Sequence, residues 1–258
     1  MSAPTLLFVF AHPDDESFSG AGTAMKCAEA GARVVLATAT LGERGKCGDP
    51  PICTPEELPA VRARELEQAA AIIGFEEVYL LGYHDKELAS APPDEIRRKL
   101  VTLIRDERPS VVFTFDPNGM NAHPDHVAIS RFTSDAVAAA ADPRWYPEPP
   151  PDGGRHANGN AGGRSYAVQR LLWTAPIPPW DAAARHPGHP GADFVIDVSA
   201  FRERRGAALR AHRTQHLSID RLFFSKPDLD RILSTEIWRQ AWGPPLERRP
   251  ADAIPMGS

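Results

Sequence analysis

Two short stretches place histidine and carboxylate side chains close together: AHPDDE at 11–16 and HPDH at 123–126. Imidazole nitrogen and carboxylate oxygen are the usual ligands of a catalytic zinc ion that has no thiolate ligands. His12 and Asp15 are three residues apart, and the second stretch can supply a third ligand. Three protein ligands leave one coordination position for water or substrate. Together the two stretches therefore predict a catalytic metal centre.

Each stretch has a simpler explanation when it is taken alone. The chain has 9 His and 26 Pro, so short His-Pro-Asp words can arise by chance. Asp125 would be explained as a helix cap, and the adjacent acids Asp14 and Asp15 as a solvated turn. The metal centre becomes the better interpretation only if the fold brings the two stretches to one place.

The helices and strands expected from the sequence would bring the two stretches to one place. Apolar runs rich in β-branched residues alternate with helical patterns, which predicts a Rossmann-like α/β fold with a mostly parallel sheet and helices on both faces. The expected strands are 5–11, 33–40, 77–83, 110–116, 166–175 and 193–199, and the expected helices are 18–31, 58–73, 93–107, 126–141, 201–215 and 229–242.

The polar clusters follow the expected strands. AHPDDE follows the first strand, TLGERGKCGDP the second, HDKEL the third and DPNGMNAHPDH the fourth. Loops after parallel strands share one edge of the sheet, and ligands bind outside the carboxyl ends of the strands. The active site is therefore expected at the C-terminal ends of the strands.

The length of 258 residues fits one domain, 1–258, and no internal repeat is visible. Residues 143–165, rich in Pro and Gly, are expected to form a long surface loop, and residues 217–258 a C-terminal helical extension.

The composition excludes several classes of protein. A net charge of -5 does not suit a protein whose main partner is a nucleic acid or an anionic membrane. The 3 cysteines argue against a disulfide framework, although a Cys47–Cys53 pair stays open, and Cys27 is expected in the core. No apolar run is long enough to insert into a membrane, and the N-terminal stretch does not follow the pattern of a secretory signal, so we expect a cytoplasmic protein.

AHPDDE followed by HPDH resembles the PIG-L/LmbE-like zinc-dependent N-deacetylases. TLGERG, VRARELEQAAAIIG, LGYHDKEL and AHRTQ resemble further blocks of that family in the same order. The resemblance covers most of residues 5–140 and returns at about 193–216. It implies a Rossmann-like hydrolase that removes the acetyl group from an N-acetylglucosamine-type small molecule. An amidase acting on a larger amide, such as a thiol conjugate or another N-acyl amino sugar, is the alternative within the family.

The resemblance also implies roles for individual residues. By the family pattern, the metal ligands are His12, Asp15 and His126, the general base is Asp14, and His123 stabilises the oxyanion or protonates the leaving amine. The metal is expected to be Zn²⁺, with Fe²⁺ as an alternative that accepts the same ligands. A homo-oligomer, trimeric or hexameric, is compatible with the family.

Two further residues are expected to face the substrate by the same resemblance. They are Arg62 in the R-x-x-E-L block and Asp85 after LGY. For Arg62 an ion pair with Glu65, three residues along the same helix, is an equally good structural explanation.

Three other classes of function compete with the deacetylase. GAGTA at 20–24 precedes a helix as a phosphate loop would, but it lacks the spacing of the dinucleotide-binding and Walker motifs. A serine hydrolase would need a G-x-S-x-G motif, which the chain lacks, and the loop cysteines have no evident histidine partner. A metal-binding protein without catalytic activity is the third alternative.

Overall fold

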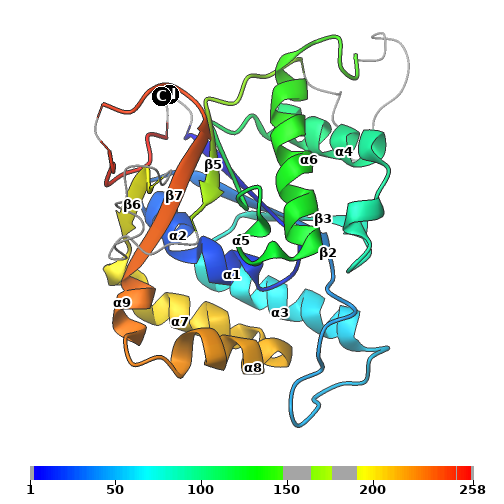
Figure 1. Cartoon of the computed structure of the whole chain (residues 1–258), viewed down its shortest axis with the longest axis vertical. Coiled ribbons are helices and arrows are strands. Elements are labelled where there is room, and N and C mark those ends of the chain that lie inside the picture. The colour runs from blue at the N-terminus through cyan, green and yellow to red at the C-terminus, as the bar shows by residue number, and fades with distance from the viewer. Residues whose placement is uncertain (1–2, 148–163, 176–190, 248, 257–258) are drawn as a thin grey trace.

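A computed structural model of the chain describes residues 3–147, 164–175, 191–247 and 249–256. These residues form a seven-stranded sheet in the order β3-β2-β1-β4-β5-β7-β6 (Figure 1). The strands are β1 Thr5–Phe10, β2 Arg33–Thr40, β3 Glu77–Tyr83, β4 Val111–Thr114, β5 Arg170–Thr174, β6 Phe194–Asp197 and β7 Thr235–Trp242.

The sheet is parallel from β3 through β5. β1 pairs in parallel with β2 and β4, and the pairs β2–β3 and β4–β5 are also parallel. β7 runs antiparallel between β5 and β6. The predicted mostly parallel α/β sheet is therefore confirmed, with an antiparallel addition at one end.

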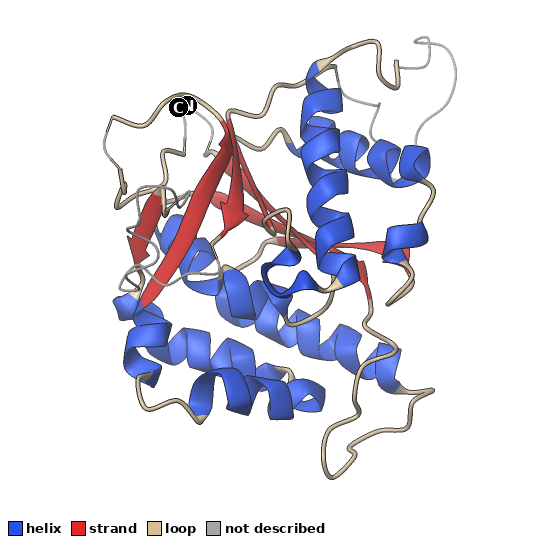
Figure 2. Ribbon diagram, in the orientation of Figure 1, coloured by secondary structure: helices blue, strands red, loops and turns tan. Residues whose placement is uncertain are grey.

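Helices cover both faces of this sheet, as Figure 2 shows. The helices are α1 Asp15–Ser19, α2 Ala21–Glu29, α3 Leu58–Ile73, α4 Pro93–Glu107, α5 Gly119–Ala122, α6 Pro124–Ala141, α7 Arg202–Ala211, α8 His216–Ile219 and α9 Leu229–Ser234. α4 and α6 pack together on one face, whereas α2, α3 and α7 pack together on the other (Figure 1). A π-helical turn, Asp220–Phe224, follows α8.

The central strands are buried because helices lie on both sides of them. Every residue of β1 from Leu6 to Phe10 is buried. Phe8 stacks on Phe113 of β4 with ring centroids 4.2 Å apart, and Trp238 of β7 meets Phe113 edge-on at 4.8 Å. Such aromatic packing adds to the free energy gained by burying the rings and ties β7 to the parallel part of the sheet.

The expected helix over 229–242 is wrong beyond Ser234, where α9 ends and β7 begins. Glu236 and Trp238, two residues apart, are the buried positions of β7, which is the alternation of a strand. The expected helical extension over 217–258 therefore contains a strand of the central sheet. Most of the expected surface loop at 143–165 lies outside the described residues.

The N-terminus of α2 has no room for a phosphate group. The backbone N–H groups of Gly22 and Thr23 donate to the Glu236 carboxylate at 2.8 and 2.7 Å. A Cβ atom on Gly22 would lie 2.7 Å from the Val198 side chain, so this glycine is required for close packing. The phosphate-loop interpretation of GAGTA is therefore wrong.

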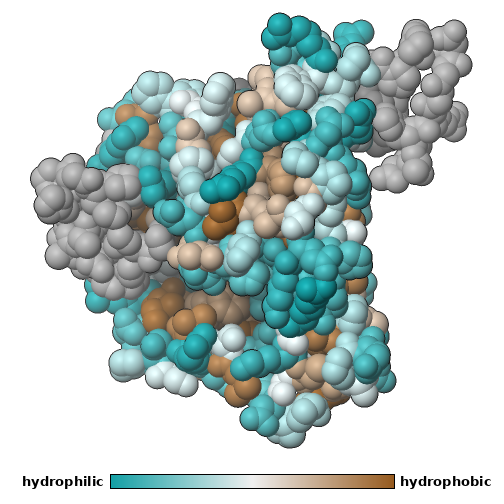
Figure 3. All heavy atoms as spheres, turned by 45° about the vertical axis from the view of Figure 1, so that its right-hand side comes forward, coloured by the Kyte–Doolittle hydropathy of each residue, from teal (hydrophilic) through white to brown (hydrophobic). Residues whose placement is uncertain are grey.

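The face of the molecule in Figure 3 is mainly hydrophilic, and hydrophobic side chains gather in a hollow in its lower half. None of the helices in the described part of the chain has the length and apolar character needed to cross a bilayer. Cys27 is buried in α2 as expected, and the thiols of Cys47 and Cys53 are free.

Candidate active site

The two histidine-carboxylate stretches meet at the C-terminal ends of β1 and β4. His12 follows β1 directly, Asp15 begins α1, and His126 lies in the first turn of α6. His123 caps α6, because its Nδ1 accepts the N–H of Asp125 at 3.2 Å. The cap is thus a histidine rather than Asp125, and the fold brings both stretches to one place.

Three side chains converge between these elements. His12 Nδ1 lies 3.2 Å from His126 Nε2. Asp15 Oδ2 lies 3.5 Å from His12 Nδ1, and Asp15 Oδ1 lies 3.3 Å from His126 Nε2. Ligands at zinc–nitrogen and zinc–oxygen distances are separated by about 3.3 Å along the edge of a tetrahedron. The two imidazole nitrogens are therefore spaced like neighbouring ligands of one tetrahedral zinc ion, and each of them has an oxygen of the Asp15 carboxylate beside it.

The hydrogen bonds on the far side of each imidazole direct its lone pair into this triangle. His12 Nε2 lies 3.2 Å from both Asp85 Oδ1 and Asp125 Oδ2, which places its proton on Nε2. His126 Nδ1 lies 3.1 Å from the carbonyl oxygen of Gly119, which places its proton on Nδ1. A carboxylate or carbonyl behind a histidine is the usual support of a metal ligand.

The cluster favours a positive charge. Burial lowers the pKa of His12, but hydrogen bonds to Asp125, Asp15 and Asp85 outweigh burial and raise that pKa to about 12. Two imidazole lone pairs and a carboxylate that face one another repel unless a cation or a proton lies between them. The chemistry of the donor set therefore fits a divalent metal ion.

Two other groups of donors share His12. His12, His123 and His126 lie close enough to hold an ion, as do His12, Asp85 and Asp125. The latter two carboxylates already accept backbone N–H groups, Asp85 from Arg44 at 3.1 Å and Asp125 from Lys86 at 2.6 Å. Asp15 also accepts backbone N–H groups, from Ala11 at 3.2 Å and His12 at 2.8 Å, but both reach Oδ2 and leave Oδ1 beside His126 Nε2. The set on the Nδ1 side of His12 is the better metal site because it combines this oxygen with two imidazole lone pairs.

Asp14 lies beside the cluster in an unusual backbone conformation. Its φ is 113°, in the left-handed region that a non-glycine residue rarely adopts, and its N–H donates to Glu16 Oε2 at 3.0 Å. Burial raises the pKa of Asp14 to about 6, with Asp15 adding to the rise and Arg62 opposing it. A carboxyl group with this pKa is suited to proton transfer near neutral pH.

Arg62 holds the Asp14 segment in place. Its guanidinium donates to the carbonyl oxygens of Pro13 and, at 3.0 Å, of Gly42, and it lies 3.4 Å from the Asp14 carboxylate. The alternative of an Arg62–Glu65 pair is wrong, because Glu65 instead accepts the N–H and the hydroxyl of Thr214 at 2.8 and 2.6 Å.

His123 and Asp85 face different sides of the cluster. The Nδ1 of His123 accepts a backbone N–H, so a neutral ring carries its proton on Nε2 and can donate. Burial lowers the pKa of His123, and the neighbouring imidazoles of His12 and His126 lower it further. Asp85, expected to face substrate, has both oxygens occupied by His12 and Arg44, which favours a role in orienting His12.

Glu16 and Ser17 of α1 form a second histidine-carboxylate cluster with His212 at the end of α7, and we call it the closed cluster. Glu16 Oε1 accepts the Ser17 hydroxyl at 2.6 Å and lies 2.7 Å from His212 Nε2, and all three side chains are fully buried. Sequence reasoning assigned these residues no role. The sequence did contain a signal for these residues. Glu16 ends AHPDDE and His212 is the histidine of AHRTQ, and both stretches resemble blocks of the family.

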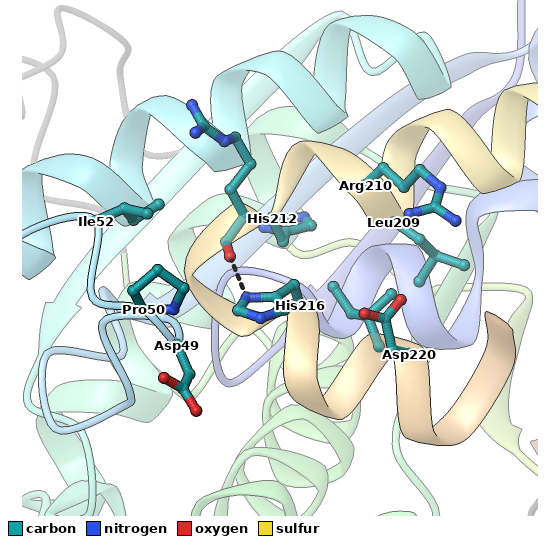
Figure 4. A pocket seen from close by; sticks show the side chains of 10 residues that line it. Asp49, Pro50, Ile52, Leu209, Arg210, His212, His216 and Asp220 are labelled. Carbon is teal, nitrogen blue, oxygen red and sulfur yellow. Dashed lines mark hydrogen bonds between the residues drawn. The ribbon is translucent and has the colours of Figure 1, made fainter. Parts of the chain in front are cut away.

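One cavity contains the residues of the metal cluster, and another is lined by His212 of the closed cluster. A cavity of about 450 Å³, hereafter the open pocket, is lined by the residues of the metal cluster, by Asp14, Arg62 and His123, and by part of the loop after β2. A second cavity, of about 410 Å³, has Pro50, His212 and His216 in its lining, as Figure 4 shows. The dashed line marks the 3.1 Å contact between His216 Nδ1 and the carbonyl oxygen of Arg213.

The family model described as PIG-L, GlcNAc-PI de-N-acetylase, matches residues 7–137. The chain belongs to the PIG-L family. The matched segment contains AHPDDE and HPDH, together with Arg62 and Asp85. The resemblance deduced from the sequence is confirmed.

Two curated deacetylases are similar to different shares of the chain. The 1D-myo-inositol 2-acetamido-2-deoxy-alpha-D-glucopyranoside deacetylase of Streptomyces griseus is 32% identical over 95% of this chain and 85% of the relative. The probable N-acetyl-alpha-D-glucosaminyl L-malate deacetylase 2 of Bacillus anthracis is 39% identical over 52% of this chain and 59% of its own length.

A solved structure shares the fold of this PIG-L chain. The conserved protein TT1542 of Thermus thermophilus superposes with a TM-score of 0.69 at 27% identity, over 93% of this chain and 96% of the other. The similarity of fold therefore extends over most of the described residues.

Proposed function

We propose that this chain hydrolyses the acetamide of an N-acetylglucosamine-type substrate and releases acetate and a free amine. The observation that carries the proposal is the convergence of His12, Asp15 and His126 within 3.2–3.5 Å, at one edge of the sheet. Membership of the PIG-L family and relatives named as deacetylases of N-acetylated glucosaminides support the substrate class.

His12, Asp15 and His126 would hold a divalent metal, for which we propose zinc because its usual ligands are imidazole and carboxylate. A metal ion in that position supplies Lewis-acid polarisation of the amide carbonyl and activation of water. Asp85 and Asp125 fix the orientation of His12 from behind, as hydrogen-bonded carboxylates do for other metal-binding histidines.

Asp14 and His123, beside this site, have different tasks: Asp14 transfers protons and His123 donates a hydrogen bond. Asp14 accepts the proton of the attacking water, which its position in the open pocket and its raised pKa favour. The Nε2–H of His123 donates a hydrogen bond to the oxyanion that forms on the carbonyl oxygen. The proton held by Asp14 passes to the amide nitrogen, the C–N bond breaks, and the amine leaves with acetate as the second product.

Arg62 has a positioning role in this proposal. Its bonds to the carbonyl oxygens of Pro13 and Gly42 connect the Asp14 turn to the loop after β2. We further infer that residues 1–258 act as one catalytic domain. The support is β7, which comes from the C-terminal segment and lies inside the sheet between β5 and β6.

The test is direct hydrolysis of a substrate panel. The purified, zinc-loaded chain is incubated with N-acetylglucosaminides that carry different groups at C1, and both free amine and acetate are measured. We expect equal amounts of amine and acetate and loss of both with a chelator. Release of neither product from any N-acetylglucosaminide, with metal bound, would contradict the proposal.

A further inference from the structure

The outer part of the open pocket carries an excess of positive charge. The cationic residues that line the pocket are Arg44, Lys46, Arg62, Lys86 and Arg221, and the acidic ones are Asp14, Asp15 and Asp85. All three acids contact His12, His126 or Arg62 in the inner part of the pocket. The chain as a whole has a net charge of -5, so this accumulation does not follow from composition.

Three of the five cations are already paired within the protein. Arg62 is held by Asp14 and two carbonyl oxygens. Arg44 pairs with Glu87, and Lys86 Nζ donates to the carbonyl oxygen of Arg44 at 3.1 Å. These cations are therefore partly neutralised or fixed before any ligand binds.

Lys46 and Arg221 differ from them. Within the part of the chain that the structure describes, neither side chain makes an ion pair or a hydrogen bond, and both residues are exposed. Lys46 lies in the loop after β2, and Arg221 lies in the π-helical turn after α8. Gln215 Nε2 donates to the carbonyl oxygen of Lys46 at 2.9 Å, which ties this loop to the segment that precedes Arg221.

We propose that Lys46 and Arg221 form a subsite for an oxyanion on the aglycone, the group attached to C1 of the amino sugar. The inference rests on the proposed function, because the acetamide of the same molecule has to reach the inner part of the pocket. Two unpaired cations in the lining of one pocket attract an anionic ligand and form charge-assisted hydrogen bonds with it. Carboxylate and phosphate share this chemistry, so the enzyme selects glycosides with an acidic aglycone.

The test compares matched substrates with the zinc-loaded full chain at constant ionic strength. The probes are N-acetylglucosaminyl L-malate, N-acetylglucosamine 1-phosphate and neutral methyl N-acetylglucosaminide. We expect at least one anionic probe to exceed the neutral probe in kcat/KM by about tenfold, and added salt to reduce this ratio. The better of the two anions identifies carboxylate or phosphate as the preferred group.

Substitutions locate the effect at the two cations. Lys46→Gln and Arg221→Gln should each lower the anionic-to-neutral ratio about threefold, and the double variant should bring it close to one. Lys226→Gln is the matched control: it removes the same charge five residues after Arg221, outside the pocket lining, and should keep the wild-type ratio. A wild-type ratio of one, or a ratio unchanged in the double variant, would overturn the subsite.

A binding measurement separates this inference from the proposed function. Calorimetric titration with the amines glucosaminyl L-malate, glucosamine 1-phosphate and methyl glucosaminide reports the subsite without any turnover. Tighter binding of an anionic amine, lost in the double variant, supports the subsite even if no acetamide is hydrolysed. Equal affinity for all three amines contradicts it, whatever the outcome of the activity assay.

Discussion

Asp15 and Glu16 are neighbours in α1, yet they belong to two histidine-carboxylate clusters with different character. Asp15 lies with His12 and His126 at the open pocket. Glu16 lies with Ser17 and His212 in the closed cluster, where no side chain is exposed. Both clusters pair a carboxylate with imidazole, so the presence of these two groups does not by itself determine what a cluster can bind.

The difference lies in whether a carboxylate oxygen is left without a hydrogen-bond donor from the protein. The backbone N–H groups of Ala11 and His12 reach only Oδ2 of Asp15. Glu16 receives the Ser17 hydroxyl, the His212 ring and the N–H of Asp14, which occupy both of its oxygens. In the open cluster, by contrast, two imidazole lone pairs and a carboxylate oxygen face one another. In the closed cluster both oxygens of Glu16 are satisfied without a ligand, and only His212 Nδ1 lacks a hydrogen-bond partner among its buried polar side-chain atoms, whereas the open cluster requires a cation.

Removing the acid that faces the open pocket should have the largest effect. Asp14→Asn keeps the shape of the side chain but cannot accept a proton, so kcat should fall by roughly 10²–10⁴ while bound metal is retained. Steady-state kinetics and elemental analysis of the same preparation measure both quantities. Asp49→Asn, on the loop after β2, is the control and should stay within about twofold of the wild type. Unchanged kcat in Asp14→Asn would remove Asp14 from its proposed role.

Breaking the closed cluster should affect stability rather than metal binding. His212→Leu leaves the charge of Glu16 buried without its partner and should reduce the free energy of unfolding by about 3–5 kcal/mol. Denaturant titration measures this loss. Adding Glu16→Gln to His212→Leu should restore part of it, because the unpaired charge is then gone. A loss below about 1 kcal/mol would mean that the pair is not a stabilising unit.

The same pair should make stability depend on pH. Burial lowers the pKa of His212, but Glu16 outweighs burial and raises that pKa above its ordinary value of 6.5. Burial raises the pKa of Glu16, but His212 outweighs burial and lowers that pKa below its ordinary value of 4.5. The stabilisation is therefore fully present between these two values.

As pH rises above 6.5, His212 in the unfolded chain loses its proton first. The stabilisation then falls until His212 in the folded chain is also deprotonated. The difference in free energy of unfolding between wild type and His212→Leu should be greater at pH 5.5 than at pH 8.5. The opposite trend would exclude a charged pair.

Removing a carboxylate behind the open cluster should have a smaller effect than removing a ligand. Asp125→Asn weakens the hydrogen bond to His12 Nε2 and should lower metal affinity about 10–100-fold. Competition with a chromophoric chelator measures the affinity. Asp135→Asn, on the exposed side of α6, is the control and should bind metal like the wild type. Equal affinity for Asp125→Asn would mean that Asp85 alone orients His12.

Local patterns in the sequence predicted much of the fold. The bounds of β2, α3, β3 and α4 agree with the expected ranges, because each has an unbroken apolar period between strong turn residues. β7 was missed because the short helix α9 runs directly into a strand, and the strand is specified by neighbours such as Phe113 rather than by its own pattern.

The site was predictable to a similar extent. AHPDDE and HPDH identified the side chains that the fold brings together. Histidines and carboxylates that lie close together in the sequence form a short motif that can be recognised without the structure. His212 is 196 residues from Glu16, and no local pattern connects them. The orientation of Asp85 towards His12 likewise depends on the loop after β2, whose path the sequence does not specify.

The most direct test of the contrast between the two clusters is metal content per chain by elemental analysis. The samples are wild type, His126→Ala and Asp14→Asn, each exposed to excess Zn²⁺ and then freed of unbound metal. We expect about one zinc per chain in the wild type and in Asp14→Asn, and a large loss in His126→Ala with the fold intact. A wild type that binds no metal, or a His126→Ala chain that binds as much as the wild type, would contradict it.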